Sequence, residues 1–443
     1  MSSTRMAKGA AMATENPERP AAAFPPRHGR LRRPHAVVTV LKAAGIAVAV
    51  AVVAAGGIGA FELNDLGQRV ADNGIDISNG ADAATATPLP VPRIGAIEGG
   101  FNFLLVGTDN DAAQGDAYGV RDATLNDVNI LLHVSADHTS GVVVSLPRDL
   151  IVPHPECVDP DTGEEFYAMS GRPLNEAWSR GGLGCVVATV SELTGQTIPY
   201  AGTVSFNGVI AMTDAIGGVP VCVEEAIDDP DAALVLPAGT STISGATALG
   251  FLRSRHGVGD GSDLSRISSQ QTYMSSLMRT MKSADTLGDL SKLYGLARAA
   301  ASNVKLSSNL TSLDSIVAMA YALKDIDLDH LVFVQYPGGT GDADYPGKVV
   351  PYTDLADELF AAIAADQPFS LDGDSLGRGT VLDPNATPTP VAPTPTPTPT
   401  EDPEVIAAAA PAAAAPAAAP AQVISGLKGM TATTQTCAAA YSG

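Results

Sequence analysis

Four basic residues in the central part of the chain occupy positions suited to binding an anion. Arg148 follows an apolar run in VVVSLPRDL, where Pro147 fixes the turn before it. Arg253 and Arg255 lie in FLRSR, and both point to one face if this segment is extended. Guanidinium groups are planar, bidentate donors, so several of them together suit a phosphate or a diphosphate.

A glycine-rich loop, GVGDGSD, follows these arginines and leads into a predicted helix that Ser262 or Asp263 is placed to cap. Arg266 opens this helix, and Gln270 lies one turn further on over the same face. A helix start offers N–H groups and a positive dipole to an anion. The alternative is ordinary ion pairing, of Arg148 with Asp149, Arg255 with Asp260 and Arg266 with Asp263.

Two carboxylates flank the first predicted strands. Asp109 follows FNFLLVGT, and Asp127 begins DVNILLHV. If the two strands are neighbours, both side chains meet at one sheet edge and are able to hold Mg²⁺, which takes oxygen ligands and substrate phosphates. The alternative is turn chemistry, because Asp is common at strand ends. The chain has no Walker A loop, GxSxG elbow or HExxH motif, so hydrolase and NTPase functions lack their usual signatures.

Alternating strand and helix patterns must position these residues. Short β-branched runs predict strands, and longer runs with helical spacing predict helices. The alternation indicates an α/β or α+β layered domain over residues 98–369. The predicted strands cover 101–107, 127–134, 141–146, 219–223 and 330–336, and the predicted helices cover 185–195, 206–218, 264–282, 286–301, 310–323 and 353–365.

The charge of the chain is divided between two parts. The total is −22, yet residues 1–42 carry eight basic and two acidic residues. The acidic remainder argues against a general nucleic-acid binder. Residues 43–61 are uncharged and long enough to span a bilayer as a helix. The positive-inside rule then predicts a single-pass cell-membrane protein with a cytoplasmic N-terminus and an exterior domain. The alternative is a cleaved signal peptide.

Composition predicts further segments around the domain. Residues 62–97 form an expected stalk behind the cytoplasmic lead and the membrane helix. Residues 370–423 are rich in Pro, Thr and Ala and predict an extended linker, and 424–443 are too short for an independent domain. An even number of cysteines outside the cytoplasm favours disulfides. We expect Cys157–Cys185 across a loop-rich stretch, with Cys222–Cys437 by elimination.

Taken together, these segments resemble the LytR-CpsA-Psr family of cell-wall ligases, in the form found in actinobacteria. The resemblance covers residues of about 100–340, and the SLPRD, FLRSR and DLSRISSQQ elements in this order carry it. It implies an αβα-layered mixed sheet domain behind one N-terminal transmembrane helix. It also implies transfer of a glycopolymer phosphate from a polyprenyl-diphosphate carrier to a peptidoglycan hydroxyl.

The resemblance assigns roles to individual residues. Asp109 and Asp127 would hold Mg²⁺ (or Mn²⁺) and, with Arg148 and Arg255, would carry the catalysis. The chain departs from the family where many members have an arginine and it has Leu125, and Arg121 is the candidate substitute. Arg172 is the corresponding substitute at Pro173. The expected diphosphate-binding set is Arg121, Arg148, Arg253, Arg255, Arg266 and Gln270.

Two other functions are compatible with the same residues. A polyprenyl-diphosphate hydrolase would use the site with water as the acceptor. A non-catalytic adaptor would bind wall polymer through the domain and a partner through the Pro-rich tail. The expected partners in all cases are polymer, peptidoglycan and, through one helix, the membrane, with no nucleic acid.

Overall fold

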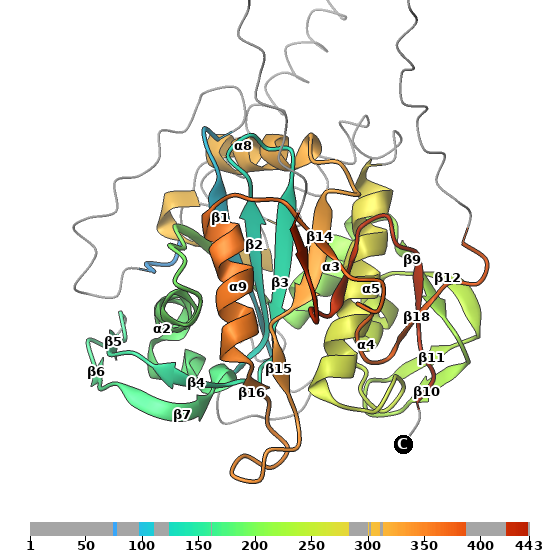
Figure 1. Ribbon diagram of the computed structural model, residues 1–443, viewed down its shortest axis with the longest axis horizontal. Helices are drawn as coiled ribbons and strands as arrows, with labels where there is room; N and C mark the ends of the chain where they lie inside the picture. Colours follow the sequence, from blue (N-terminus) through green and yellow to red (C-terminus); the bar gives the residue numbers. More distant parts are fainter. Residues whose placement is uncertain are drawn as a thin grey trace, which may run out of the picture. The chain divides into compact units, whose positions relative to one another are not determined.

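The structure of the protein is a computed structural model (Figure 1). None of the described helices is long and apolar enough to cross a membrane. The cytoplasmic lead, the predicted membrane span 43–61, Arg121 and most of the predicted helix 286–301 lie outside the described residues. The structure describes residues 74–77, 97–109, 124–160, 162–282, 300, 303–310, 313–386 and 422–441.

A seven-stranded mixed sheet forms the centre of the domain, in the order β13-β8-β1-β2-β3-β14-β20. The β1–β8 and β3–β14 pairs are parallel, and the other pairs are antiparallel. All four strands of this sheet that the sequence predicts are confirmed. The strands are β1 (Phe101–Thr108), β2 (Asn126–Val134), β3 (Gly141–Leu146), β8 (Tyr200–Val204), β13 (Val304–Leu306), β14 (Leu331–Gln335) and β20 (Gly429–Thr431).

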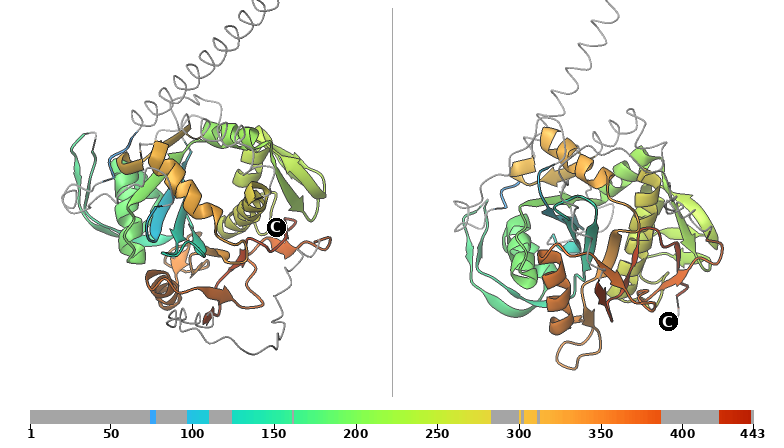
Figure 2. Two further views of the ribbon diagram at one scale, coloured as in Figure 1. Left: turned by 90° about the horizontal axis from the view of Figure 1, so that it is seen from above. Right: turned by 45° about the horizontal axis from the view of Figure 1, so that its top comes forward.

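Helices cover both faces of this sheet, so the layered α/β architecture expected from the sequence is present (Figures 1 and 2). The helices α2 and α9 share the first core with one face of the sheet. The helix α8 and two methionines of α5 share the second core with the other face. The helices are α2 (Trp178–Thr194), α3 (Phe206–Ile216), α4 (Gly245–Arg253), α5 (Asp263–Lys282), α8 (Leu313–Lys324) and α9 (Thr353–Ala364), with short 3-10 turns η1 (Leu174–Glu176) and η2 (Ser308–Leu310).

A second, four-stranded sheet packs against the opposite side of α5 and encloses the third core. Its order is β12-β9-β21-β18, and β9 is the strand predicted over 219–223. The helix α5 therefore lies between two sheets. The strands are β9 (Val219–Val223), β12 (Gly239–Ile243), β18 (Thr380–Leu382) and β21 (Thr436–Ala438).

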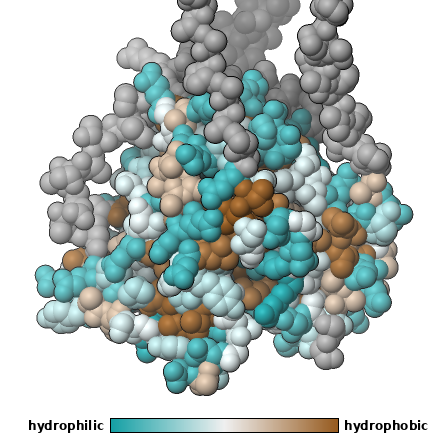
Figure 3. Space-filling view, viewed as in Figure 1, coloured by the Kyte–Doolittle hydropathy of each residue, from teal (hydrophilic) through white to brown (hydrophobic). Residues whose placement is uncertain are grey.

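Short two-stranded ribbons complete the fold at its edges. On the face shown in Figure 3, apolar residues form separate patches within a largely hydrophilic surface. The ribbons are β4 (Ile151–His154) with β7 (Met169–Pro173), β5 (Cys157–Val158) with β6 (Glu165–Phe166), β10 (Ile227–Asp229) with β11 (Leu234–Leu236), β15 (Gly338–Gly339) with β16 (Val350–Pro351), and β17 (Phe369–Leu371) with β19 (Gln422–Ile424).

The C-terminal region differs from the expected linker and separate end segment. Residues 370–386 continue the domain, because they contribute β18 to the second sheet. Residues 422–441 return to it, since β20 extends the central sheet beside β14 and β21 pairs between β9 and β18. A segment this short cannot bury a core alone, and its strands gain stability by completing two existing sheets.

The return of the C-terminal segment explains the burial of α5. The sequence predicts one apolar stripe on this helix, yet its residues from Asp263 to Ser276 are buried on nearly every side. Its hydroxyl side chains bond the strands around it: Thr272 bonds Thr436 at 3.0 Å, and Ser275 donates to the carbonyl of Ala432 at 3.0 Å. Buried polar groups are tolerated where they are hydrogen-bonded in this way.

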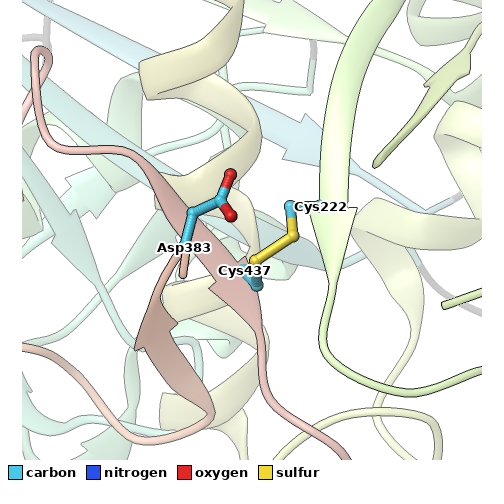
Figure 4. Close-up of side chains that lie close together, drawn as sticks. All are labelled: Cys222, Asp383 and Cys437. Carbon is cyan, nitrogen blue, oxygen red and sulfur yellow. A yellow bond between two sulfur atoms is a disulfide. The ribbon is translucent and has the colours of Figure 1, made fainter. Parts of the chain in front are cut away.

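Both expected disulfides are present. Cys157–Cys185 joins the start of β5 to α2, over a separation of 28 residues. Cys222–Cys437 joins β9 to β21, over a separation of 215 residues. Figure 4 shows this second bond with Asp383 beside it. Since both sulfurs are in the disulfide, this group does not provide thiolate ligands for a metal.

We expect the two disulfides to differ in their contribution to stability. Loop-closure entropy grows with loop length, so replacing Cys222 and Cys437 by Ala should cost about 2 kcal/mol more than the same change at Cys157 and Cys185. The free energy of unfolding of the full-length protein in detergent, measured with guanidinium chloride, checks this order. Equal or smaller destabilisation by the Cys222/Cys437 pair would contradict it.

Candidate functional site

A cavity of about 300 Å³ lies where β2, β3, α3, α4 and α5 approach one another. It collects six of the eight residues that the sequence singles out. Their chemical roles stay predictions, but their assembly in one place is a property of the fold. The cavity is lined by Asp127, Val128, Arg148, Phe206, Leu252, Arg253, Arg255, Arg266 and Gln270.

Arg148 lies in a tight turn directly after β3. The N–H of Leu150 bonds the carbonyl of Pro147 at 3.1 Å, which closes the turn. The Arg148 Nη1 donates to Asp127 Oδ1 at 2.7 Å, so the guanidinium spans the distance between two strand ends. Burial lowers the pKa of Arg148, but the carboxylates of Asp127 and Asp149 outweigh it and the pKa is raised overall. Arg148 therefore keeps its charge.

Asp263, the first residue of α5, connects three arginines through one buried carboxylate. Its Oδ1 lies 2.5 Å from Arg266 Nη2 and 3.4 Å from Arg255 Nη2. Its Oδ2 accepts the backbone N–H of Arg148 at 3.1 Å. The pairing of Arg266 with Asp263 is thus confirmed, whereas the pairing of Arg255 with Asp260 is wrong. The sequence predicts an anion-binding site at the start of this helix, and the carboxylate of Asp263 lies there instead.

The segment with Arg253 and Arg255 is not extended as expected. Arg253 is the last residue of α4, and Ser254 ends the helix in an extended conformation. The Ser254 hydroxyl donates to Asp229 Oδ2 at 2.7 Å, which fixes this ending. Arg253 then stacks over the ring of Phe206, 4.4 Å from its centroid. The two arginines still reach one cavity, because the break after α4 redirects the chain.

Arg266 and Gln270 lie on one face of α5, as their spacing predicts. Arg266 Nη2 donates to the carbonyl of Asp127 at 2.9 Å, which ties the helix to β2. Gln270 Nε2 donates to the carbonyl of Leu252 at 3.0 Å, near the end of α4. Both side chains therefore brace the walls of the cavity as well as line it.

The arginines of the cavity are not fully neutralised by the carboxylates around them. The pKa of Arg255 falls to about 10, first because of burial and then because Arg266 and Arg148 repel a third positive charge. Like charges held this close in a buried site favour binding of an anion, which relieves the repulsion. The cavity therefore concentrates positive charge that the carboxylates around it offset only in part.

Asp109 lies near this cavity but does not line it. It follows β1, and Thr108 at the end of that strand pairs with Asn126 at the start of β2, next to Asp127. Asp109 is buried, and its Oδ1 accepts the N–H of Leu125 at 2.9 Å. The two carboxylates thus belong to the same edge of the sheet, as the sequence predicts.

The sequence missed two contributors to the site, Phe206 and Lys348, whereas the pairing of Arg148 with Asp149 that it offered as an alternative is present. Phe206 supports Arg253, and its place after the cap residue Ser205 was its only signal. Asp149 bonds Lys348 at 2.6 Å and lies 3.5 Å from Arg148 Nε, although Lys348 is 199 residues away in the chain. No local pattern points to such a distant pair.

The candidate substitute Arg172 lies outside the cavity lining. It belongs to β7 and donates to Glu176 at 2.8 Å through its Nε. This i,i+4 pair is half exposed, with 50% of the arginine side chain accessible. Arg172 therefore has a local partner rather than a place among the cavity arginines.

The protein is thus a mixed α/β domain that gathers four arginines in one cavity, beside the ends of β2 and β3. The chain matches the LytR_cpsA_psr family over residues 75–358, and it belongs to that family. The match includes β1 to β16, the first half of α9, and every residue of the cavity.

Among its relatives is the cell wall biosynthesis protein LcpA of Corynebacterium glutamicum, 29% identical over 56% of this chain and 52% of LcpA. The chain thus spans about half the length of that relative. The polyisoprenyl-teichoic acid–peptidoglycan teichoic acid transferase TagT of Bacillus subtilis is 24% identical over 65% of this chain and 84% of TagT. A solved LytR-Csp2A-Psr enzyme from Actinomyces oris has a TM-score of 0.45 at 22% identity, over 61% and 95% of the two chains.

Replacing Asp263 by Asn should destabilise the domain, since it leaves the buried Arg255 and Arg266 without their shared carboxylate. We expect a loss of about 3 kcal/mol in the free energy of unfolding. Asp231→Asn is the matched control, because Asp231 pairs with His256 at a site where 81% of its side chain is exposed. The control should change stability by less than about 0.5 kcal/mol. Equal melting curves for the two variants would show that Asp263 does not organise the cluster.

Proposed function

We propose that the protein is a membrane-anchored phosphotransferase that moves a glycopolymer phosphate from a polyprenyl-diphosphate carrier to a peptidoglycan hydroxyl. The observation that carries this proposal is the group of four arginines in one cavity, with Arg255 depressed to a pKa of about 10 by burial and by its neighbours. Such a cluster suits a diphosphate. The relative TagT supports a polyisoprenyl-linked donor and a peptidoglycan acceptor.

The surface next to the arginines suits the apolar tail of such a donor. Val128 and Leu252 line the cavity beside the charged groups. One ridge of α5 is formed by three residues at four-residue spacing, Arg266, Gln270 and Met274. Along this ridge the side chains change from a cation to an amide and then to a thioether. Met274 and its successor on the ridge, Met278, pack partly exposed against the second core. An amphiphile would be bound with its diphosphate at Arg266 and its chain along this ridge.

Magnesium, or manganese, fits the donor set at the edge of the sheet. Asp109 and Asp127 would hold the ion, because carboxylate oxygens are the ligands that these cations prefer. Asp127 already balances Arg148 through one oxygen, so the ion would add positive charge to a mixed site. When bound, the ion would neutralise phosphate charge and orient the diphosphate.

The contribution of the chain's own residues would be to bind and stabilise the charged phosphate groups. The acceptor hydroxyl attacks the phosphorus that carries the glycopolymer, a new P–O bond forms, and the bond to the polyprenyl phosphate breaks. The leaving polyprenyl phosphate keeps the electron pair, and the hydroxyl proton passes to a base at the site. Arg148, Arg255 and Arg266 stabilise the charge that develops, which is the main requirement of phosphoryl transfer.

The location that fits this activity is the outer side of the cell membrane. The uncharged run 43–61 would be the single anchor, with the N-terminus in the cytoplasm. Two disulfides in the domain agree with an oxidising compartment. An anchored enzyme meets a lipid-linked donor at high effective concentration.

Arg255→Ala and Asp127→Ala should each lower transfer by about 100-fold or more, because the first removes a cation at the diphosphate and the second removes a proposed metal ligand and the partner of Arg148. Transfer is measured with full-length protein in detergent, a synthetic polyprenyl-diphosphate glycan and a soluble peptidoglycan oligomer. Arg172→Ala, outside the cavity, is the control and should retain wild-type rates.

Wild-type transfer in both cavity variants would refute the assignment. Release of polyprenyl phosphate without an acceptor, at the rate of transfer, would make the protein a hydrolase instead. Polymer binding that persists without Asp109 and Asp127, with no turnover in any variant, would make it an adaptor.

Chelation should test the proposed ion. Removing divalent metal with EDTA should stop transfer, and added Mg²⁺ or Mn²⁺ should restore it. Asp127→Asn weakens an oxygen ligand, so this variant should need more metal to reach half of its own maximal rate. Full activity of the wild type in EDTA would exclude a metal role for Asp109 and Asp127.

A further inference from the structure

The hairpin formed by β15 and β16 is tied to the wall of the arginine cavity. Lys348, at the end of its loop 340–348, donates to Asp149 Oδ1 at 2.6 Å. The other oxygen of Asp149 lies 3.5 Å from Arg148 Nε. Burial raises the pKa of Asp149, but the hydrogen bond from Lys348 and the charges of Lys348, Arg148 and Arg255 together lower it below its usual value, so this carboxylate stays charged. One end of the loop is thus fixed beside a diphosphate-binding arginine.

The other end of the same loop contacts Arg378, which reaches the glycine-rich loop before α5. Arg378 Nη1 donates to Thr340 Oγ1 at 3.1 Å and to Asp260 Oδ2 at 3.3 Å. Asp260 belongs to the glycine-rich loop before α5. That loop meets the Arg378 segment closely, because a Cβ on Gly259 would lie 2.7 Å from the Cα of Gly379. The loop 340–348 therefore has a side-chain contact at each end, from Thr340 to Arg378 and from Lys348 to Asp149.

The hairpin presents two tyrosines to solvent. Tyr345 is 36% exposed and Tyr352 is 57% exposed, although most tyrosine surface is usually buried. Each hydroxyl rests on a glycine: Tyr345 on Gly171 of β7, where a Cβ would come within 2.7 Å, and Tyr352 on Gly339 of β15. A side chain at either glycine would displace the ring above it. The rings are held in position, and each keeps a third or more of its surface open to solvent.

The direction of α5 assigns this hairpin to the second substrate. Asp260 and Arg378 lie near the N-terminal end of the helix, Arg266 and Gln270 lie in the cavity, and Met274 lies beyond it. At 1.5 Å per residue the ridge from Arg266 to Met278 runs about 18 Å away from the hairpin side. In Figure 1 the β15–β16 loop and α8 lie at opposite ends of the domain. If the lipid tail takes the apolar end, the acceptor must approach from the hairpin.

We infer that the β15–β16 hairpin binds the glycan strand of the peptidoglycan acceptor, with Tyr345 and Tyr352 as its contacts. Tyrosine suits a sugar, because the ring packs on the apolar C–H face while the hydroxyl bonds its polar groups. The contact of Lys348 with Asp149 keeps the loop beside Arg148. A glycan strand bound to the loop would therefore bring an acceptor hydroxyl next to the bound diphosphate. This inference rests on the proposed function for the nature of the acceptor.

The test separates binding from transfer. Full-length protein in detergent is sedimented with peptidoglycan sacculi stripped of attached polymers, with no donor present. The double variant Tyr345→Ala/Tyr352→Ala should lose at least about tenfold in apparent affinity, which corresponds to about 1.4 kcal/mol. Tyr345→Phe/Tyr352→Phe keeps the rings and should retain most of the binding. Val235→Ala, which trims a 74% exposed side chain on β11, is the control and should bind as the wild type does.

The same variants in the transfer assay complete the test. The double alanine variant should raise the KM for the peptidoglycan oligomer and leave the KM for the donor unchanged. Circular dichroism at the assay temperature should show that this variant and the phenylalanine variant are both folded, so that a loss of binding reports the removed rings. Wild-type sedimentation and acceptor KM in that variant would overturn the inference while leaving the transferase intact. If sacculi bind in a way that depends on the tyrosines but no transfer occurs, the peptidoglycan-binding surface is supported and the proposed reaction is overturned.

Discussion

One buried carboxylate organises the cavity. Asp263 forms ion pairs with Arg255 and Arg266 and accepts a hydrogen bond from the backbone N–H of Arg148. These contacts connect three parts of the chain: the turn after β3, the end of α4 and the start of α5. Arginines repel one another, and a cluster of them is stable only around a shared counter-charge or a bound anion. Asp263 balances the guanidinium groups of Arg255 and Arg266, while Asp127 and Asp149 balance that of Arg148. These carboxylates hold the arginines together in the free domain.

The position of α5 between two sheets gives the site its polarity. The first turns meet the arginine cavity, and the later turns meet the second core. The helix cannot rotate or slide, because its hydroxyls bond the strands of the C-terminal segment and Gln335 of β14 bonds Ser268 at 2.7 Å. A rigid helix with one charged and one apolar end suits a ligand of the same character. The hairpin at its N-terminal side then leaves a separate approach for a second ligand.

The sequence predicts what local pattern controls. The strands 101–107 and 141–146, the helix 206–218, and the i,i+4 pair of Arg266 and Gln270 follow from periodicity and end signals, and the structure agrees within a few residues. It could not reveal contacts set by distant chain segments. Asp149 with Lys348 depends on the pairing of Leu150 with Val349 beside it. The full burial of α5 likewise depends on strands that follow a Pro/Ala-rich stretch, where composition predicted only a short segment outside the domain.

The disulfide between β9 and β21 also determines the covalent topology of the chain. Residues 386 and 422 both belong to the same folded body, and in the sequence Cys222 precedes the stretch 387–421 whereas Cys437 follows it. A single peptide-bond cut within 387–421 would therefore yield two polypeptides that remain one molecule until the disulfide is reduced. The last strands of both sheets would stay in place after such a cut. In an oxidising environment, a cut within 387–421 would thus leave the two parts of the folded domain covalently joined.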